Sequence, residues 1–372
     1  MGDKVEEVLQ ALEDALKFWS IQLSSADGEL KKNVPASTVK DPLEELVKIV
    51  KLIKAHTTKV GIIYEPSKLE KSGEASITTV SDLSKSFVLF ISALAQVSSE
   101  NISHLFYDEI KSMAHSLVLS ATQFSEELKA LYNNVVSEKS EKKTESDNAS
   151  EGDPRLVSVG KIWNLCDDFT KLIEGGKLKV LEKKTKMHLS LVEDGLDEFA
   201  EWAENPEDMD DEDPFGLEDD FSDEEEEDED DEDGRNPPVP DDDDDKEDKK
   251  QVSKDREELV RYSKLWLQKF KLVKLLFLSI NKSLSTLTSG QSIDEIFQTE
   301  GIIVREIDTL IVELMLNQTL DDVVEKHAFA VDVACFKIVA ILRDTNKKSE
   351  GKVKWCASWE AKYNEFSDDM YK

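Results

Sequence analysis

The sequence predicts an all-α protein made of antiparallel helical bundles and interrupted by a long acidic loop. Outside the low-complexity stretches, apolar residues recur at intervals of three and four, which is the period of an amphipathic helix. No alternating pattern long enough for a useful strand occurs. The predicted helices are roughly 15 to 30 residues long and are joined by short turns, which favours antiparallel packing.

Four helices are predicted before residue 137. The second opens at Asp41, a capping residue, and at Pro42, which fits the first turn of a helix. The stretch SGEASIT from Ser72 is predicted to be a loop, so that the third helix opens at Thr79 or Ser81. The four apolar faces span residues 5–23, 43–53, 87–94 and 106–135.

Helices also dominate the rest of the chain. A connector at 137–154, predicted to be flexible, leads to two helices separated by Gly175 and Gly176. After an acidic segment, one apolar face runs from Leu259 to Leu287, where Ser289 and Gly290 end it. The remaining three faces span residues 296–314, 320–342 and 353–366.

The acidity of the chain belongs to one internal segment. The 372 residues carry a net charge of −34. Between Glu204 and Asp248 there are 28 acidic and two basic residues, a net of −26, which leaves −8 for the other 327 residues. Such a segment cannot offset the entropy of ordering it, about 1–2 kcal/mol per residue. We therefore expect an N-terminal bundle at 1–203, a disordered insert at 204–250, and C-terminal helices at 251–372 that pack on the N-terminal part.

The cysteines and the N-terminus indicate a cytoplasmic and nuclear protein. Cys166, Cys335 and Cys356 are far apart and odd in number, and they form neither a disulfide framework nor a CxxC site. The N-terminus lacks the apolar core of a signal peptide, and no stretch approaches 18 uncharged apolar residues. We expect no membrane association.

No residue pattern predicts catalysis, a metal or a cofactor. The five histidines come without HExxH or a Cys/His cluster, and no phosphate-binding glycine loop or GxSxG occurs. His188 and His327 lie on apolar helical faces, where packing in or near the core is the favoured interpretation. The acidic segment has many carboxylates but no scaffold to fix a catalytic pair.

Two groups of lysines raise the question of nucleic-acid binding. The favoured interpretation is the solvated face of an amphipathic helix, because phosphate would be repelled by a chain of this net charge. An alternative is that the acidic segment folds back on these lysines in a salt-sensitive contact. The groups are Lys177, Lys179, Lys183, Lys184 and Lys186, and Lys264, Lys269, Lys271, Lys274 and Lys282.

The acidic segment contains two candidate interaction sites. Ser222 precedes a run of acidic residues, the pattern that acidophilic casein-type kinases bind, so it is a predicted phosphorylation site. Four apolar residues lie just before or beside it in an acidic background. They form a candidate partner-docking motif that would fold on binding, unless they reflect composition alone. These residues are Pro214, Phe215, Leu217 and Phe221.

Several segments together resemble the cyclin-D-binding protein family, also described as GCIP or Maid homologues. The order of the predicted helices is similar from Val5 to Arg343. The segments are VGKIWNLCDDFTKL, LVEDGLDEFAEW, DEDPFGLEDDFSDEEEE and LVRYSKLWLQKFKLVKLLFLSI. The most specific piece is Asp213 to Leu217. The resemblance implies helical bundles of the vinculin and talin type and no enzymatic activity. It also implies a nuclear and cytoplasmic regulator that binds cyclin D and helix-loop-helix factors. The C-terminal segment from Lys347 to Lys372 has no counterpart in this comparison.

Three hypotheses for function follow. The first is a protein-interaction regulator of the cell cycle or transcription, of the cyclin-D-binding type. The second is a histone chaperone or another carrier of basic proteins, in which the acidic segment screens positive charge. The third is an enzyme, which the lack of any catalytic pattern disfavours. We expect no cofactor and no direct binding to nucleic acid.

Overall fold

The computed structural model describes residues 2–25, 39–69, 73–137, 153–204 and 244–370, together with Leu30, Lys32 and Val34. The described residues form helices joined by turns and contain no strand, which confirms the predicted all-α class. Two units are present. Unit 1 comprises Met1–Leu181 and Ser289–Asp294, and unit 2 comprises Glu182–Thr288 and Glu295–Lys372.

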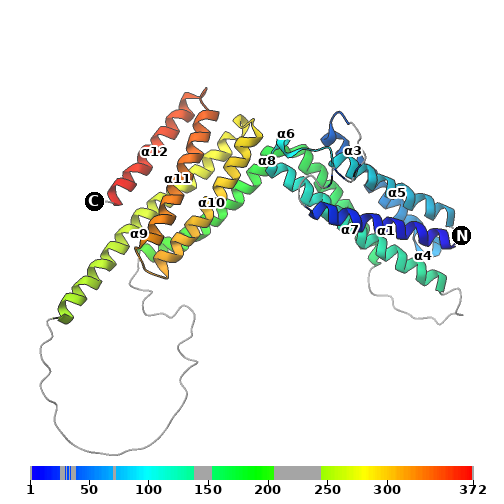
Figure 1. The fold of residues 1–372 in the computed structure, drawn as a ribbon, viewed down its shortest axis with the longest axis horizontal. Coiled ribbons are helices and arrows are strands. Elements are labelled where there is room, and N and C mark those ends of the chain that lie inside the picture. Colours follow the sequence, from blue (N-terminus) through cyan, green and yellow to red (C-terminus); the bar gives the residue numbers. More distant parts are fainter. Residues whose placement is uncertain are drawn as a thin grey trace, which may run out of the picture. The chain divides into compact units, whose positions relative to one another are not determined.

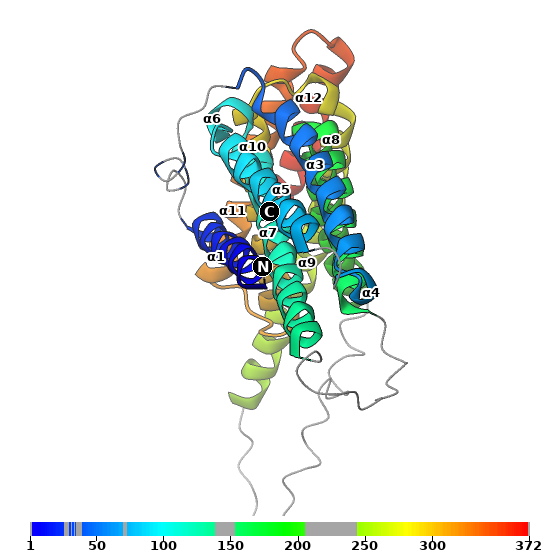
Figure 2. The same ribbon diagram turned by 90° about the vertical axis from the view of Figure 1, so that its right-hand side faces the viewer.

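Unit 1 is a bundle of long helices (Figures 1 and 2). It contains α1 (Gly2–Ser24), α3 (Pro42–Ile63), α5 (Gly73–Leu94), α7 (His104–Ser137) and the first part of α8 (Pro154–Glu204). The short helices α4 (Pro66–Leu69) and α6 (Ser99–Ile102) lie in its connections. The main packing pairs are α3 with α5, α1 with α7, and α1 with α5. Phe90 and Phe169 meet edge to face in its core, with ring centroids 5.4 Å apart.

Unit 2 is a second bundle. It contains the last part of α8, α9 (Asp244–Ser283), most of α10 (Gly290–Met315), α11 (Asp322–Thr345) and α12 (Glu350–Met370). A short 3₁₀ turn, Leu284–Thr286, follows α9. Helix α12 packs on α9 and α11. Phe270 lies at the centre of the core, because its ring is 5.4 Å from both Phe199 and Trp266 and all three side chains are fully buried.

Two helix starts are capped by an aspartate side chain, and the cap at Asp41 was predicted. Asp41 accepts hydrogen bonds from the backbone N–H groups of Leu43 (3.1 Å) and Glu44 (3.0 Å) at the start of α3. Asp321 does the same for Val323 and Val324 at the start of α11. Each carboxylate satisfies N–H groups that have no partner within their helix.

The predicted loop at Ser72 is wrong from Gly73 onward, because α5 already begins there. Ser76 is fully buried, so this first part of the helix packs against the bundle. The hydroxyls of Thr78 and Thr79 donate to the carbonyls of Glu74 and Ala75, four residues back, which suits a helix rather than a turn.

The predicted break at Gly175 and Gly176 is confirmed. Gly176 has φ +66° and ψ −175°, which interrupts the helical conformation inside α8. Residues after Leu181 pack within unit 2, where Glu193 forms an ion pair with Lys274 of α9 at 2.7 Å. The division between the units therefore lies inside α8. The predicted organisation into a bundle at 1–203, an insert at 204–250 and helices at 251–372 stays a prediction.

Helix α5 has the length and composition that a membrane span requires, with a mean hydropathy of 1.3 over its most apolar 18-residue window. A core helix of a bundle has the same composition. Val80, Phe87 and Phe90 of α5 are buried, and the helix packs on α3 and α1.

Candidate functional site

An exposed tryptophan is held in place on the surface of unit 1. Trp163 of α8 is 37% exposed, and its indole N–H donates to the hydroxyl of Thr58 on α3 at 3.1 Å. Lys54 of α3 lies 6.0 Å from the centre of its ring and forms an ion pair with Asp167 at 2.6 Å. We call Trp163, Thr58, Lys54 and Asp167 the Trp163 face.

A cavity of about 280 Å³ adjoins this face between α3 and α8. Its floor includes Cys166, which is 1% exposed, and burial raises the pKa of this thiol to about 12. The thiol therefore stays protonated at neutral pH and is not a nucleophile. The lining residues are Val50, Lys51, Lys54, Cys166, Asp167, Thr170 and Lys171.

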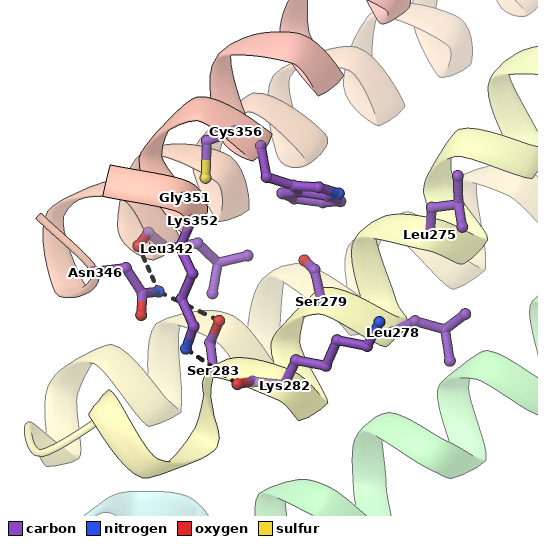
Figure 3. Close-up of a pocket in the computed structure, with 11 residues that line it drawn as sticks. Leu275, Leu278, Ser279, Lys282, Ser283, Leu342, Asn346, Gly351, Lys352 and Cys356 are labelled. Atoms are coloured by element: carbon purple, nitrogen blue, oxygen red, sulfur yellow. Dashed lines mark hydrogen bonds between the residues drawn. The ribbon is translucent and has the colours of Figure 1, made fainter. Parts of the chain in front are cut away.

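A second cavity, of about 260 Å³, lies in unit 2 between α9, α11 and α12 (Figure 3). Leu275 and Leu278 of α9 and Trp355 of α12 expose 50%, 37% and 36% of their surface, although all three are large apolar residues. Leu342 and Cys356 are buried beneath them. We call this cavity the α9–α12 groove, which is lined by Leu275, Leu278, Ser279, Lys282, Ser283, Leu342, Asn346, Gly351, Lys352, Trp355 and Cys356.

The polar groups at one end of the groove bond to one another. The Asn346 amide donates to the hydroxyl of Ser283 at 3.2 Å and to the carbonyl of Leu342 at 2.8 Å. Its oxygen accepts from Thr286 at 2.9 Å. The ammonium group of Lys352 donates to the carbonyl of Lys282 at 3.1 Å, as Figure 3 shows. These bonds hold the end of α9 against the end of α11 and the start of α12.

The charge of the groove is opposite to that of the chain. Lys282 and Lys352 are the charged residues in its lining, and no carboxylate lines it. Within the described ranges, neither lysine forms an ion pair with an acidic side chain. The groove therefore combines an apolar surface with two ammonium groups in a protein of net charge −34.

Lys269 was expected on a solvated face, and this expectation is wrong. The side chain is 1% exposed and its ammonium group lies 2.8 Å from Asp332 of α11. It also lies 4.3 Å from the ring centre of Trp266 and 4.6 Å from that of Tyr363. Burial lowers the pKa of Lys269, and Asp332 opposes that shift. This group links α9, α11 and α12 in the core of unit 2.

The two histidines are packed as predicted, and each contacts a carboxylate that the sequence pattern did not identify. His188 is 7% exposed, stacks on Phe297, and has its Nδ1 3.0 Å from Glu300. His327 is half-buried, with its Nδ1 2.6 Å from Glu306. Within the described residues, no group of three or more His, Cys, Asp or Glu side chains could hold a metal ion.

The predicted sites of the acidic segment lie outside the described residues. These sites are the phosphorylation site Ser222 and the docking motif Pro214, Phe215, Leu217 and Phe221. They remain predictions.

Three known proteins or families are similar to this chain. A model of the family described as Grap2 and cyclin-D-interacting, N-terminal, matches residues 45–205. The uncharacterized protein YLR287C of Saccharomyces cerevisiae is 28% identical over 341 residues, which cover 87% of this chain and 86% of that protein. The uncharacterized protein C22E12.18 of Schizosaccharomyces pombe is 23% identical over 203 residues, which cover 54% of this chain and 55% of that protein.

The family match covers the Trp163 face. It ends before Asp213 to Leu217, the motif on which the predicted resemblance depends most. The matched range includes most of α3 and all of α5, α7 and α8. It confirms the predicted resemblance: residues 45–205 of this chain match the model of the Grap2 and cyclin-D-interacting N-terminal family.

Proposed function

We propose that this protein is a non-enzymatic regulator of the cell cycle or transcription that acts by binding other proteins in the nucleus and cytoplasm. The partners are a D-type cyclin or a helix-loop-helix factor. The observation that carries the proposal is the family match over residues 45–205, because the family is described as cyclin-D-interacting. A family match supports a partner less strongly than a fold, so the partner is the part to test first.

The Trp163 face is the contact surface that we assign to this function. Tryptophan is enriched among the few residues that supply most of the binding energy at interfaces. Thr58 and Lys54 hold the ring of Trp163 before any partner arrives, so less rotamer entropy is lost on binding. The adjoining cavity offers a partner side chain a place to insert beside the ring.

The chemistry of the described residues supports binding rather than catalysis. Burial raises the pKa values of the thiols of Cys166, Cys335 and Cys356, which keeps these groups protonated. Burial likewise raises the pKa of the carboxyl of Glu300, which is fully enclosed by its own unit and contacts Thr185 and His188. These groups have the surroundings of structural side chains.

A carrier of basic proteins is the second candidate. The 28 acidic residues between Glu204 and Asp248 favour it, because so dense a negative charge attracts histones and other basic chains. Ser222 belongs to the same segment, and we propose that an acidophilic casein-type kinase phosphorylates it. Replacing Ser222 by Ala would then remove one phosphate from the product of such a kinase, as measured by mass spectrometry.

The experiment compares partners of two tagged proteins purified from cells: the full chain and a chain that lacks residues 204–248. Mass spectrometry identifies the partners after washes at 0.1 M and 0.5 M salt. The proposal predicts a cyclin or a helix-loop-helix factor with both proteins and at both salt concentrations. Histones that dominate the full-chain sample and disappear with the deletion and at high salt would establish the carrier instead.

A further inference from the structure

We propose that the α9–α12 groove is a binding site for the chain's own segment from Asp213 to Asp223. In this contact, apolar side chains of the segment enter the groove and its carboxylates face Lys282 and Lys352. The inference is independent of the partner in the proposed function, because the Trp163 face belongs to unit 1 and the groove belongs to unit 2.

The size and surface of the groove fit apolar side chains. An apolar cavity of about 150 Å³ is large enough to hold benzene. The groove has about 260 Å³ and presents Leu275, Leu278 and Trp355 to solvent. Covering these side chains removes apolar surface from water, which is the main driving force for docking of this kind.

The charge of the groove selects an acidic occupant. Lys282 and Lys352 line it without any neighbouring carboxylate in the lining. The nearby Lys354 is already paired with Glu350 at 2.7 Å, and Lys347 with Asp344 at 3.3 Å. Lys282 and Lys352 line the groove itself and form no ion pair among the described residues, so their ammonium groups can meet an incoming anion. An ammonium group that meets a carboxylate forms a charge-assisted hydrogen bond.

The segment has the complementary pattern. Phe215, Leu217 and Phe221 are spaced along it, and acidic residues surround each of them. Because the segment and the groove belong to one chain, the effective concentration of the segment at the groove reaches about the millimolar range. A weak contact between the segment and the groove is thus sufficient for occupancy within one chain.

The chain is long enough on both sides of the segment. The end of α8 lies near Phe270, since Phe199 packs on that ring, and Ser279 of the groove is nine residues further along α9. Nine helical residues span about 14 Å, and the five residues from Phe199 to Glu204 add at most about 8 Å. Ten extended residues join Glu204 to Pro214 and can span about 33 Å. From Phe221, 23 residues span up to about 75 Å, against about 52 Å of helix from Asp244 to Ser279.

Photo-crosslinking in the full chain tests the contact directly. The probe p-benzoylphenylalanine replaces Phe215, and in a control chain it replaces Val239 of the same acidic segment. Labelled and unlabelled chains are mixed, so that mass spectrometry separates crosslinks within one chain from those between two copies. The proposal predicts crosslinks from position 215 to residues 275–283 or 351–356 within one chain. Crosslinks between copies, or a distribution equal to that from position 239, would overturn it.

A charge-reversal pair tests the role of the two lysines. We expect the double variant Lys282→Glu and Lys352→Glu to reduce the groove crosslink at least about tenfold while preserving the melting temperature. The matched control reverses Lys326 and Lys337, two exposed lysines of α11 outside the groove, and should leave the crosslink unchanged. An equal loss with both pairs would contradict site-specific docking.

Binding of a synthetic peptide decides what fills the groove. The peptide covers residues 211–223, and its affinity is measured for the full chain and for a chain with Phe215, Leu217 and Phe221 changed to Ser. We expect the changed chain to bind at least about tenfold more tightly, because its own segment no longer competes. Equal binding to both chains would show a groove open to acidic peptides from partners. Binding to neither chain would also refute the proposal.

Discussion

The ammonium group of Lys269 lies 2.8 Å from the carboxylate of Asp332, and Tyr363 donates its hydroxyl to the same oxygen at 2.8 Å. These three residues come from α9, α11 and α12. The aromatic rings of Trp266 and Tyr363 enclose the ammonium group. A charge buried in this way is stable only while its partner remains.

We therefore predict that Lys269→Met lowers the free energy of unfolding by about 1–3 kcal/mol, because it leaves the half-buried Asp332 without its cation. The matched control is Lys274→Met, which removes a half-exposed lysine of α9 that is paired with Glu193 of α8. That change should cost less than about 1 kcal/mol. Urea denaturation followed by circular dichroism measures the free energy of unfolding of both variants. Equal decreases would contradict a stabilising role of the buried Lys269–Asp332 pair.

The kink in α8 predicts opposite effects at two glycines of that helix. Gly176 has φ +66°, so Gly176→Ala places a Cβ in a conformation that costs about 1–3 kcal/mol. Gly160 lies in regular helix, and a Cβ there would meet no atom within 4 Å. Gly160→Ala should therefore stabilise the protein by about 0.4–1 kcal/mol. Thermal melting of both variants tests the pair, and a stabilised Gly176→Ala would rule out the kinked conformation.

Asp294 caps a helix that begins 190 residues earlier in the sequence. It accepts hydrogen bonds from the backbone N–H groups of His104 (2.8 Å) and Leu105 (2.9 Å) at the start of α7, and it is 9% exposed. We predict that Asp294→Ala costs about 2–3 kcal/mol, because both N–H groups lose a charged acceptor in a buried setting. The exposed cap variant Asp41→Ala should cost about 1 kcal/mol. A smaller loss for Asp294 than for Asp41 in chemical denaturation would contradict this ranking.

The contact between Glu306 and His327 predicts a pH-dependent contribution to stability. The hydrogen bond from His327 lowers the pKa of Glu306 in the folded protein, with a further contribution from Arg305. A carboxyl with a lowered folded pKa stabilises the protein above its unfolded pKa of 4.5, and this stabilisation is lost as the pH falls through the folded pKa.

We predict that Glu306→Gln lowers the free energy of unfolding by about 1 kcal/mol at pH 6 to 7, because the anionic acceptor of His327 is lost. The difference from the unmodified protein should shrink as the pH is lowered past 4.5. Urea denaturation at a series of pH values measures it, with Asp344→Asn on the exposed surface as the control. A difference that stays constant over this range would refute the assignment.

Sequence reasoning identified features that depend on near neighbours in the chain. The spacing of apolar residues predicted the helices, Asp41 predicted the start of α3, and the Gly175–Gly176 pair predicted the kink. The same reasoning placed the start of α5 too late, because Thr78 and Thr79 bond back to carbonyls within the helix, and Thr79 does not cap its start.

Features that depend on distant residues were not accessible in this way. Asp294 caps residues that lie 189 and 190 positions away in the sequence. The buried Lys269 depends on Asp332, which lies 63 positions away. One feature of the sequence indicates the α9–α12 groove. The stretch from Leu272 to Ile280 has more leucines than one helix face can bury, and Leu275 and Leu278 are the two that remain exposed in the groove.

The affinity of the purified full chain for a purified D-type cyclin tests the central claim most directly, because it needs no cell extract. Isothermal titration calorimetry compares the unmodified protein with Trp163→Ala and Phe329→Ala. Phe329 is the control, because it is an aromatic residue of α11 that is 69% exposed and lies outside the Trp163 face. We predict binding by the unmodified protein, a loss of at least about 2 kcal/mol in Trp163→Ala, and no change in Phe329→Ala. Absence of binding by the unmodified protein, or equal binding by all three, would contradict the claim.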